Sequence, residues 1–103
     1  MNDIKGAIMK IKIREHAAPP ALIFDLDGDF DLYSSHEVKN QIEELISQGN
    51  HNLLLNMQKV NYLDSTGVGV LIRILLLLNQ KEGKLRLYYV NDAPLKVLQL
   101  TML

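Results

Sequence analysis

The residues of this chain most suited to chemistry are two neighbouring hydroxyls, Ser65 and Thr66, which follow Asp64 in the segment 62–69 (YLDSTGVG). They stand where an apolar strand and its loop should give way to a long helix. Free backbone N–H groups and the positive end of the helix dipole favour an anion at such a position. Ser65 can therefore be either a helix cap or an acceptor of phosphate, and the choice between these roles decides the function.

A second group of reactive side chains lies earlier, in the aspartate-rich segment 23–31 (IFDLDGDFD). A hydrophobic strand that leads into Asp-x-Asp-Gly resembles the first motif of the haloacid-dehalogenase phosphatases. On that pattern Asp25 would attack phosphorus, Asp27 would act as acid and base, and magnesium would bridge the site. Asp29, however, stands where that family has Thr or Val, and the later carboxylates Glu82 and Asp92 are isolated. An isolated motif is a weak signal, so we expect a turn here and no enzyme.

The composition of the chain limits the remaining function classes. With 103 residues, 48% of them hydrophobic, the chain should form one domain with a real core. A net charge of −1 without a basic patch predicts no nucleic-acid partner. Cysteine is absent and the histidines lack ligand spacing, so neither a metal nor a cofactor is expected. The longest apolar run, 68–78, contains Arg73 and no secretory signal is visible, which favours a cytoplasmic protein without membrane insertion.

Hydrophobic periodicity, capping signals and turn residues predict an alternation of strands and helices. The expected elements are strands at 9–14 and 21–24 with a proline break at 17–20, a helix from Ser34 to Gly49, a strand at 52–57, a helix at 65–82, a strand at 84–90 and a helix from Asp92. Right-handed crossovers should make the later strands parallel, whereas the opening hairpin is antiparallel. The predicted fold class is a single α/β domain over 1–103, with a mixed sheet, packed helices and a possible tail at 1–8.

Several local features of these elements are also predicted. Ser34 and Glu37 form a capping-box pattern at the start of the first helix. The apolar strand 52–57 is typical of a strand that is covered on both faces. Gly83 should stop the second helix, and Gly67 and Gly69 should permit close backbone approach.

The last two helices carry further expectations. The second helix is apolar all round, so it either lies centrally or exposes a surface for a partner or for a second copy in a homodimer. The residues of the last helix expected to face the core are Leu95, Val97, Leu98 and Leu100.

The aspartate-rich segment, the capped helix, the apolar strand and the segment 62–69 together resemble the STAS domain of bacterial anti-sigma-factor antagonists. The family pattern is a Leu-Gly-acidic-Leu-Asp turn followed by Asp-Ser-Ser/Thr-Gly-Leu-Gly. Gly28 and Asp31 match the first motif, and Val68 replaces the more common leucine of the second. The resemblance runs from about Met9 to the C-terminus. The residues that match the second motif are Asp64, Ser65, Thr66, Gly67 and Gly69.

The resemblance implies a phosphorylation switch in a binding module that is not itself an enzyme. In such proteins an anti-sigma factor that is also a serine/threonine kinase phosphorylates the hydroxyl after the aspartate. The unmodified antagonist binds this partner and frees the sigma factor. Ser65 is then the acceptor, with Thr66 as the alternative, and a PP2C-type phosphatase would reverse the step. The expected partner-binding residues are Asp29, Asp31, Asp64, Ser65, Thr66 and Gly67.

Two other functions stay open from the sequence alone. The same surface could dock constitutively, as in the STAS subunit of a transporter or of a signalling complex. A magnesium-dependent phosphatase built on Asp25 and Asp27 is the least favoured, because the other residues that this chemistry needs are missing.

Overall fold

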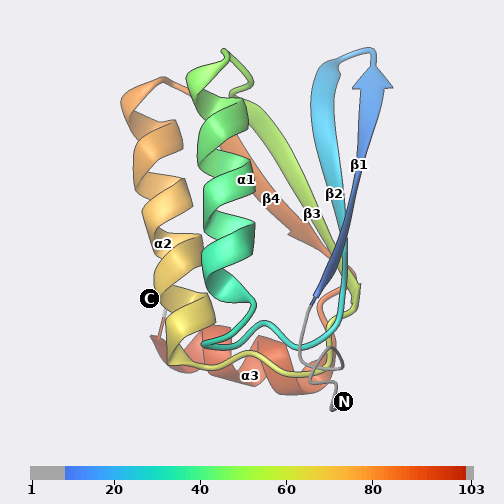
Figure 1. Ribbon diagram of the computed structural model, residues 1–103, viewed down its shortest axis with the longest axis vertical. Helices are drawn as coiled ribbons and strands as arrows, with labels where there is room; N and C mark the ends of the chain where they lie inside the picture. Colours follow the sequence, from blue (N-terminus) through green and yellow to red (C-terminus); the bar gives the residue numbers. More distant parts are fainter. Residues whose placement is uncertain (1–8, 102–103) are drawn as a thin grey trace, which may run out of the picture.

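The computed structural model of the chain describes residues 9–101, and the possible tail at 1–8 lies outside the described residues. The elements follow the predicted order (Figure 1). They are β1 (Lys10–Ala17), β2 (Pro20–Asp27), α1 (Ser35–Ser47), β3 (Asn52–Lys59), α2 (Ser65–Gln80), β4 (Lys84–Tyr88) and α3 (Asp92–Thr101).

The strands form one mixed sheet in the order β1-β2-β3-β4. β1 and β2 are antiparallel, whereas β3 is parallel to both β2 and β4. The proline break is shorter than predicted, because Ala17 and Pro20 already pair and only Ala18 and Pro19 form the turn. α1 and α2 lie side by side over the sheet, and α3 crosses the end at which β2, β3 and β4 finish (Figure 1). The predicted α/β class with a mixed sheet is therefore confirmed.

The hydrophobic core lies between the sheet and the two long helices. β2 and β3 turn alternate side chains toward the helices, and α1 and α2 supply the opposing apolar stripes. Burial of one Leu, Ile or Phe side chain contributes about 1.5–3 kcal/mol relative to exposure in water. Buried members include Phe24 and Leu26 of β2, Leu53, Leu55 and Met57 of β3, Ile42 of α1, and Leu71, Ile74 and Leu78 of α2.

The other face of the sheet, which we call the open face, bears neither α1 nor α2, so the prediction that β3 is covered on both faces is wrong. The crossovers from β2 to β3 and from β3 to β4 step in the same direction, and right-handed connections then put both helices on one side. Leu54 nevertheless stays buried on the open face, where it pairs with Ile23. Arg14 and Arg86 stand beside this pair on the adjoining strands, and their aliphatic stems can cover it.

The C-terminus of α1 ends at a glycine, as predicted. Gly49 has a φ of 99°, a conformation that glycine adopts without strain. The N–H of Asn50 donates to the carbonyl of Leu45 at 3.1 Å, and the N–H of Gly49 donates to that of Ile46 at 3.0 Å. This pair of bonds is a Schellman motif, which satisfies the last carbonyls of the helix.

The C-terminus of α2 differs from the prediction, because Glu82 and not Gly83 takes the left-handed conformation. Glu82 has a φ of 57°, and the N–H of Gly83 donates to the carbonyl of Leu78 at 2.7 Å. Gly83 is required for a different reason. A Cβ there would lie 2.3 Å from the carbonyl oxygen of His51, in the loop that precedes β3.

The last two elements are smaller than predicted. β4 ends at Tyr88 and not at Val90, because Tyr89 has a φ of 54°. α3 packs on the core through a narrower side than expected: Leu98 and Pro94 are buried and Val97 is partly buried. The prediction is wrong for two residues of α3, which are exposed: Leu95 and Leu100.

Candidate functional site

The two sequence motifs meet in space at one end of the sheet. The β2–α1 loop and the β3–α2 loop run next to each other where β2 and β3 finish (Figure 1). Phe30 and Leu63 form an isolated parallel bridge. The N–H of Phe30 donates to the carbonyl of Tyr62 at 2.9 Å, and the N–H of Asp64 donates to the carbonyl of Phe30 at 3.2 Å. Residues 28–34 and 60–67 therefore form one surface, which we call the loop edge.

Asp64 holds the loop edge together with both of its carboxylate oxygens. Its Oδ1 accepts from the N–H of Gly67 at 2.9 Å, which makes Asp64 the N-cap of α2. Its Oδ2 accepts from the N–H of Leu32 in the other loop at 3.1 Å. One side chain thus starts a helix and ties two distant chain segments to each other.

Because Asp64 supplies the cap, the hydroxyl of Ser65 is not needed for that purpose. Ser65 is the first residue of α2 and is exposed, whereas Thr66 is half-buried. Charge at this position would meet the positive end of the α2 dipole, which stabilises an anion by about 0.3–2 kcal/mol. An exposed hydroxyl at a helix N-terminus is a feasible acceptor of phosphate.

Asp31 has a similar capping role at α1. Its Oδ1 accepts from the N–H of Tyr33 at 2.9 Å and from the N–H of Ser34 at 3.1 Å, and its carbonyl accepts from the N–H of Ser35 at 2.9 Å. The carboxylate of Asp31 is therefore used to shape the loop. Whether it also contacts a partner stays a prediction.

The predicted capping box at α1 is wrong. Ser34 is buried with helical backbone angles, and its hydroxyl donates to the carbonyl of Asp29 at 2.6 Å without capping the helix. Glu37 instead accepts from Gln41, one turn further along the helix, at 2.8 Å. Asp31 lies three residues earlier and takes the role predicted for Ser34, so the helical turn effectively begins inside the loop.

The two glycines of the second motif have different surroundings. A Cβ on Gly67 would lie 2.6 Å from the carbonyl oxygen of Phe30, so α2 and the β2–α1 loop can approach only because this side chain is absent. Gly67 is also buried, which gives it a packing role. Gly69 is exposed, and among residues 9–101 no atom lies within 4 Å of its Cβ position, so the prediction of close packing inside the molecule is wrong there.

The remaining members of the loop edge give it an acidic and partly apolar surface. Asp29 is exposed, and within residues 9–101 its carboxylate has no hydrogen-bond or ion-pair partner. Leu32, Tyr33 and Tyr62 are also exposed, and sequence reasoning missed them. Their signal was available: large apolar residues directly beside the motif aspartates, in loops where polar residues are usual.

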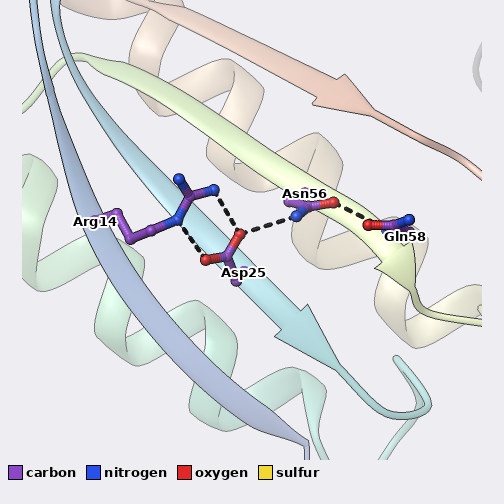
Figure 2. A network of polar contacts seen from close by, with 4 residues as sticks. All are labelled: Arg14, Asp25, Asn56 and Gln58. Atoms are coloured by element: carbon purple, nitrogen blue, oxygen red, sulfur yellow. Dashed lines mark hydrogen bonds and ion pairs between the residues drawn. The ribbon is translucent and has the colours of Figure 1, made fainter.

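Asp25, the proposed nucleophile of the phosphatase alternative, lies away from the loop edge on the open face of the sheet (Figure 2). Arg14 donates to both of its oxygens, at 2.6 and 2.9 Å, and Asn56 donates to Oδ1 at 2.9 Å. These bonds, chiefly those from Arg14, lower the pKa of Asp25 to about 2. Asp27 is exposed at the end of β2.

The geometry around Asp25 is that of a structural ion pair. Its carboxylate oxygens are occupied by Arg14 and Asn56, which opposes attack on phosphorus. Among residues 9–101 no cluster of three or more His, Asp or Glu side chains is arranged to hold a metal ion. No helix of the described residues is long and apolar enough to span a bilayer.

Comparison with known proteins finds the same architecture. A family model for the STAS domain matches residues 10–103. The anti-sigma-B factor antagonist of Staphylococcus aureus is 29% identical over 74 residues, which cover 72% of this chain and 68% of that protein. The anti-sigma factor antagonist SpoIIAA in its unphosphorylated form has a TM-score of 0.74 at 21% identity, over 88% of this chain and 83% of the other.

The Bacillus cell fate determinant SpoIIAA has also been solved in a phosphorylated form. That structure has a TM-score of 0.67 at 22% identity, over 90% of this chain and 84% of the other. These likenesses support the fold, and the family model covers nearly the whole chain. The chain therefore belongs to the STAS domain family.

Proposed function

We propose that this chain is an anti-sigma-factor antagonist whose binding is controlled by phosphorylation of Ser65. In the unphosphorylated form it binds an anti-sigma factor that is also a serine/threonine kinase, and the sigma factor is released. Phosphorylation at Ser65 ends the interaction, and a PP2C-type phosphatase restores it. The observation that carries the proposal is the division of roles at the start of α2, where Asp64 caps the helix and Ser65 is exposed beside it.

A phosphate at Ser65 has a clear electrostatic consequence. It adds about −1.5 to −2 charge and three acceptor oxygens. The N-terminus of α2 makes the dianion tolerable in the free protein, but Asp64 and Asp29 already make this surface acidic. Like-charge contact or desolvation of the dianion at an interface costs several kcal/mol, and about 2.7 kcal/mol is enough for a hundredfold loss of affinity.

The names of the relatives support the same function. The Staphylococcus aureus relative is an anti-sigma-B factor antagonist, and the Bacillus neighbour exists in both phosphorylated and unphosphorylated forms. The proposal makes this chain a substrate and a binding module, with no catalytic residue of its own. Neither a metal nor a cofactor takes part.

The proposal is tested with the purified anti-sigma kinase of the organism that encodes this chain. We expect the kinase to phosphorylate wild type and Thr66→Ala but not Ser65→Ala, as measured by intact mass. We also expect Ser65→Asp to bind the kinase at least about tenfold more weakly than Ser65→Ala, because the introduced carboxylate only partly reproduces the phosphate charge.

Two results would contradict the proposal. Equal phosphorylation of wild type and Ser65→Ala would move the acceptor to Thr66. Equal binding by Ser65→Asp and Ser65→Ala would remove the switch altogether.

A further inference from the structure

Three large apolar side chains lie exposed on the loop edge, around the proposed phosphorylation site. Leu32 is 61% exposed, Tyr33 is 76% exposed and Tyr62 is 51% exposed. They lie within three positions in sequence of side chains that do enter the core, namely Phe30 and Leu63, which are 0% and 3% exposed. The loops therefore already supply the core with apolar residues, and the three exposed side chains add nothing to it.

The backbone under these three side chains is fixed. The N–H of Leu32 is held by Asp64 at 3.1 Å and the N–H of Tyr33 by Asp31 at 2.9 Å. The carbonyl of Tyr62 accepts from Phe30 at 2.9 Å. Because the backbone is already held, a partner that covers these side chains does not have to order the loops, so more of the burial energy appears as affinity.

The charges around the three side chains indicate the chemistry of the partner. The segments 28–34 and 60–67 contain three aspartates, Asp29, Asp31 and Asp64, and no lysine or arginine. Exposed apolar side chains that share a surface with carboxylates fit a protein surface that has an apolar pocket with a basic border. A second copy of this chain would have to place its own carboxylates against these, because the same patch meets itself in a two-fold dimer.

We infer that Leu32, Tyr33 and Tyr62 are the anchors that hold the anti-sigma kinase, in an apolar pocket bordered by lysine or arginine. This inference rests on the proposed function. The anchors supply affinity that salt does not weaken, whereas the aspartates supply an attraction that salt does weaken. Phosphate at Ser65 opposes docking by changing the charge of this surface, while the anchors stay as they are.

The test measures binding of the purified anti-sigma kinase from the same organism to single alanine variants. Leu32→Ala and Tyr33→Ala are each expected to weaken binding about tenfold or more, as truncation of buried interface anchors does. The matched control is Leu76→Ala on α2, whose side chain is 56% exposed and far along the helix from its N-terminus. We expect this variant to bind like wild type.

The salt dependence of binding separates anchors from charges. Tyr33→Ala should bind more weakly at every salt concentration but keep the wild-type slope against salt. Asp29→Ala should reduce that slope. All of these side chains are exposed, so unchanged urea unfolding curves are expected and will show that each variant is folded.

The outcomes that overturn the inference are distinct from failure of the proposed function. If Ser65→Asp loses binding but Leu32→Ala and Tyr33→Ala bind within twofold of wild type, the anchors are wrong and the switch survives. If wild type does not bind the kinase, the proposed function fails. If wild type sediments as a dimer, Tyr33→Ala sediments as a monomer and the variant binds the kinase normally, the three exposed side chains serve self-association.

Discussion

Asp64 at the loop edge and Asp25 on the open face of the sheet are both half-buried aspartates, but their carboxylates do different work. Asp64 accepts from two backbone N–H groups, one on α2 and one in the β2–α1 loop. Within residues 9–101, Asp25 is bound by side chains only, those of Arg14 and Asn56, on strands whose positions the sheet already sets. The carboxylate of Asp64 determines where a loop lies, whereas that of Asp25 forms an ion pair on a surface whose shape the sheet already determines.

The same difference divides the aspartates of the segment 23–31 into those that shape the candidate site and those that lie on the sheet. Asp25 and Asp31 are six positions apart, yet Asp31 shapes the loop before α1 while Asp25 faces solvent on the sheet. Backbone-bound aspartates fix the geometry around Ser65, so changes there should affect both stability and binding. An exposed ion pair contributes little, and changes to it should leave the loop edge intact.

The largest effect is expected at Gly67, where the loop edge is packed most tightly. In Gly67→Ala the new Cβ would lie 2.6 Å from the Phe30 carbonyl oxygen and 2.7 Å from Leu63 Cδ1. The loops must shift, and we expect the free energy of unfolding to fall by about 1–3 kcal/mol. Urea unfolding followed by circular dichroism measures this change.

Gly69→Ala is the matched control, since Gly69 is exposed on the same helix and no atom of the described part of the chain lies within 4 Å of its Cβ position. It should stabilise the protein by about 0.5–1 kcal/mol, because alanine restricts the unfolded chain and favours the helix. Equal effects of the two substitutions would show that packing at the loop edge is no tighter than elsewhere on α2.

The elements of this fold were predictable because their signals are local. Alternation in β1, the glycine after α1 and the aspartate before α2 act within a few residues, and each is where the sequence indicates. The start of α1 was not predictable in detail, because Asp31 and Ser34 are both good caps and only the loop conformation selects Asp31.

Other errors concern contacts between distant residues. The leucines of β3 predicted two covered faces, but the side on which α1 and α2 pack follows from the strand order, which periodicity does not show. At the candidate site, by contrast, the positions of Asp64 and Ser65 were found from the sequence, because they belong to one local motif. The bond from Leu32 to Asp64 was not, because it joins residues 32 positions apart.

Asp64→Ala should have the second-largest effect. It removes the cap of α2 and leaves the N–H of Leu32 without its acceptor, for an expected loss of about 1–2 kcal/mol. Urea unfolding gives the energy, and faster hydrogen exchange at the Leu32 amide reports the loosened loop. Asp29→Ala, which removes an exposed carboxylate, is the control and should change stability by less than about 0.5 kcal/mol. A loss as large in the control would mean that charge at the edge, and not the bonds of Asp64, is responsible.

The smallest effect is expected for Asp25→Asn, and it should depend on pH. Hydrogen bonds from Arg14 lower the folded-state pKa of Asp25 from 3.8 to about 2, so the carboxylate contributes stability above about pH 4. That contribution is lost as the pH falls from about 4 toward 2, where the folded protein also takes up the proton. Because the pair is partly exposed, Asp25→Asn should cost under about 1 kcal/mol at pH 7, with a smaller difference from wild type at pH 3. Urea unfolding at both pH values measures the difference. The expectation is contradicted if Asp25→Asn lowers the free energy of unfolding at pH 7 as much as Asp64→Ala does, or if the difference from wild type does not shrink in acid. The ion pair on the open face would then matter to stability as much as the bonds of the loop edge.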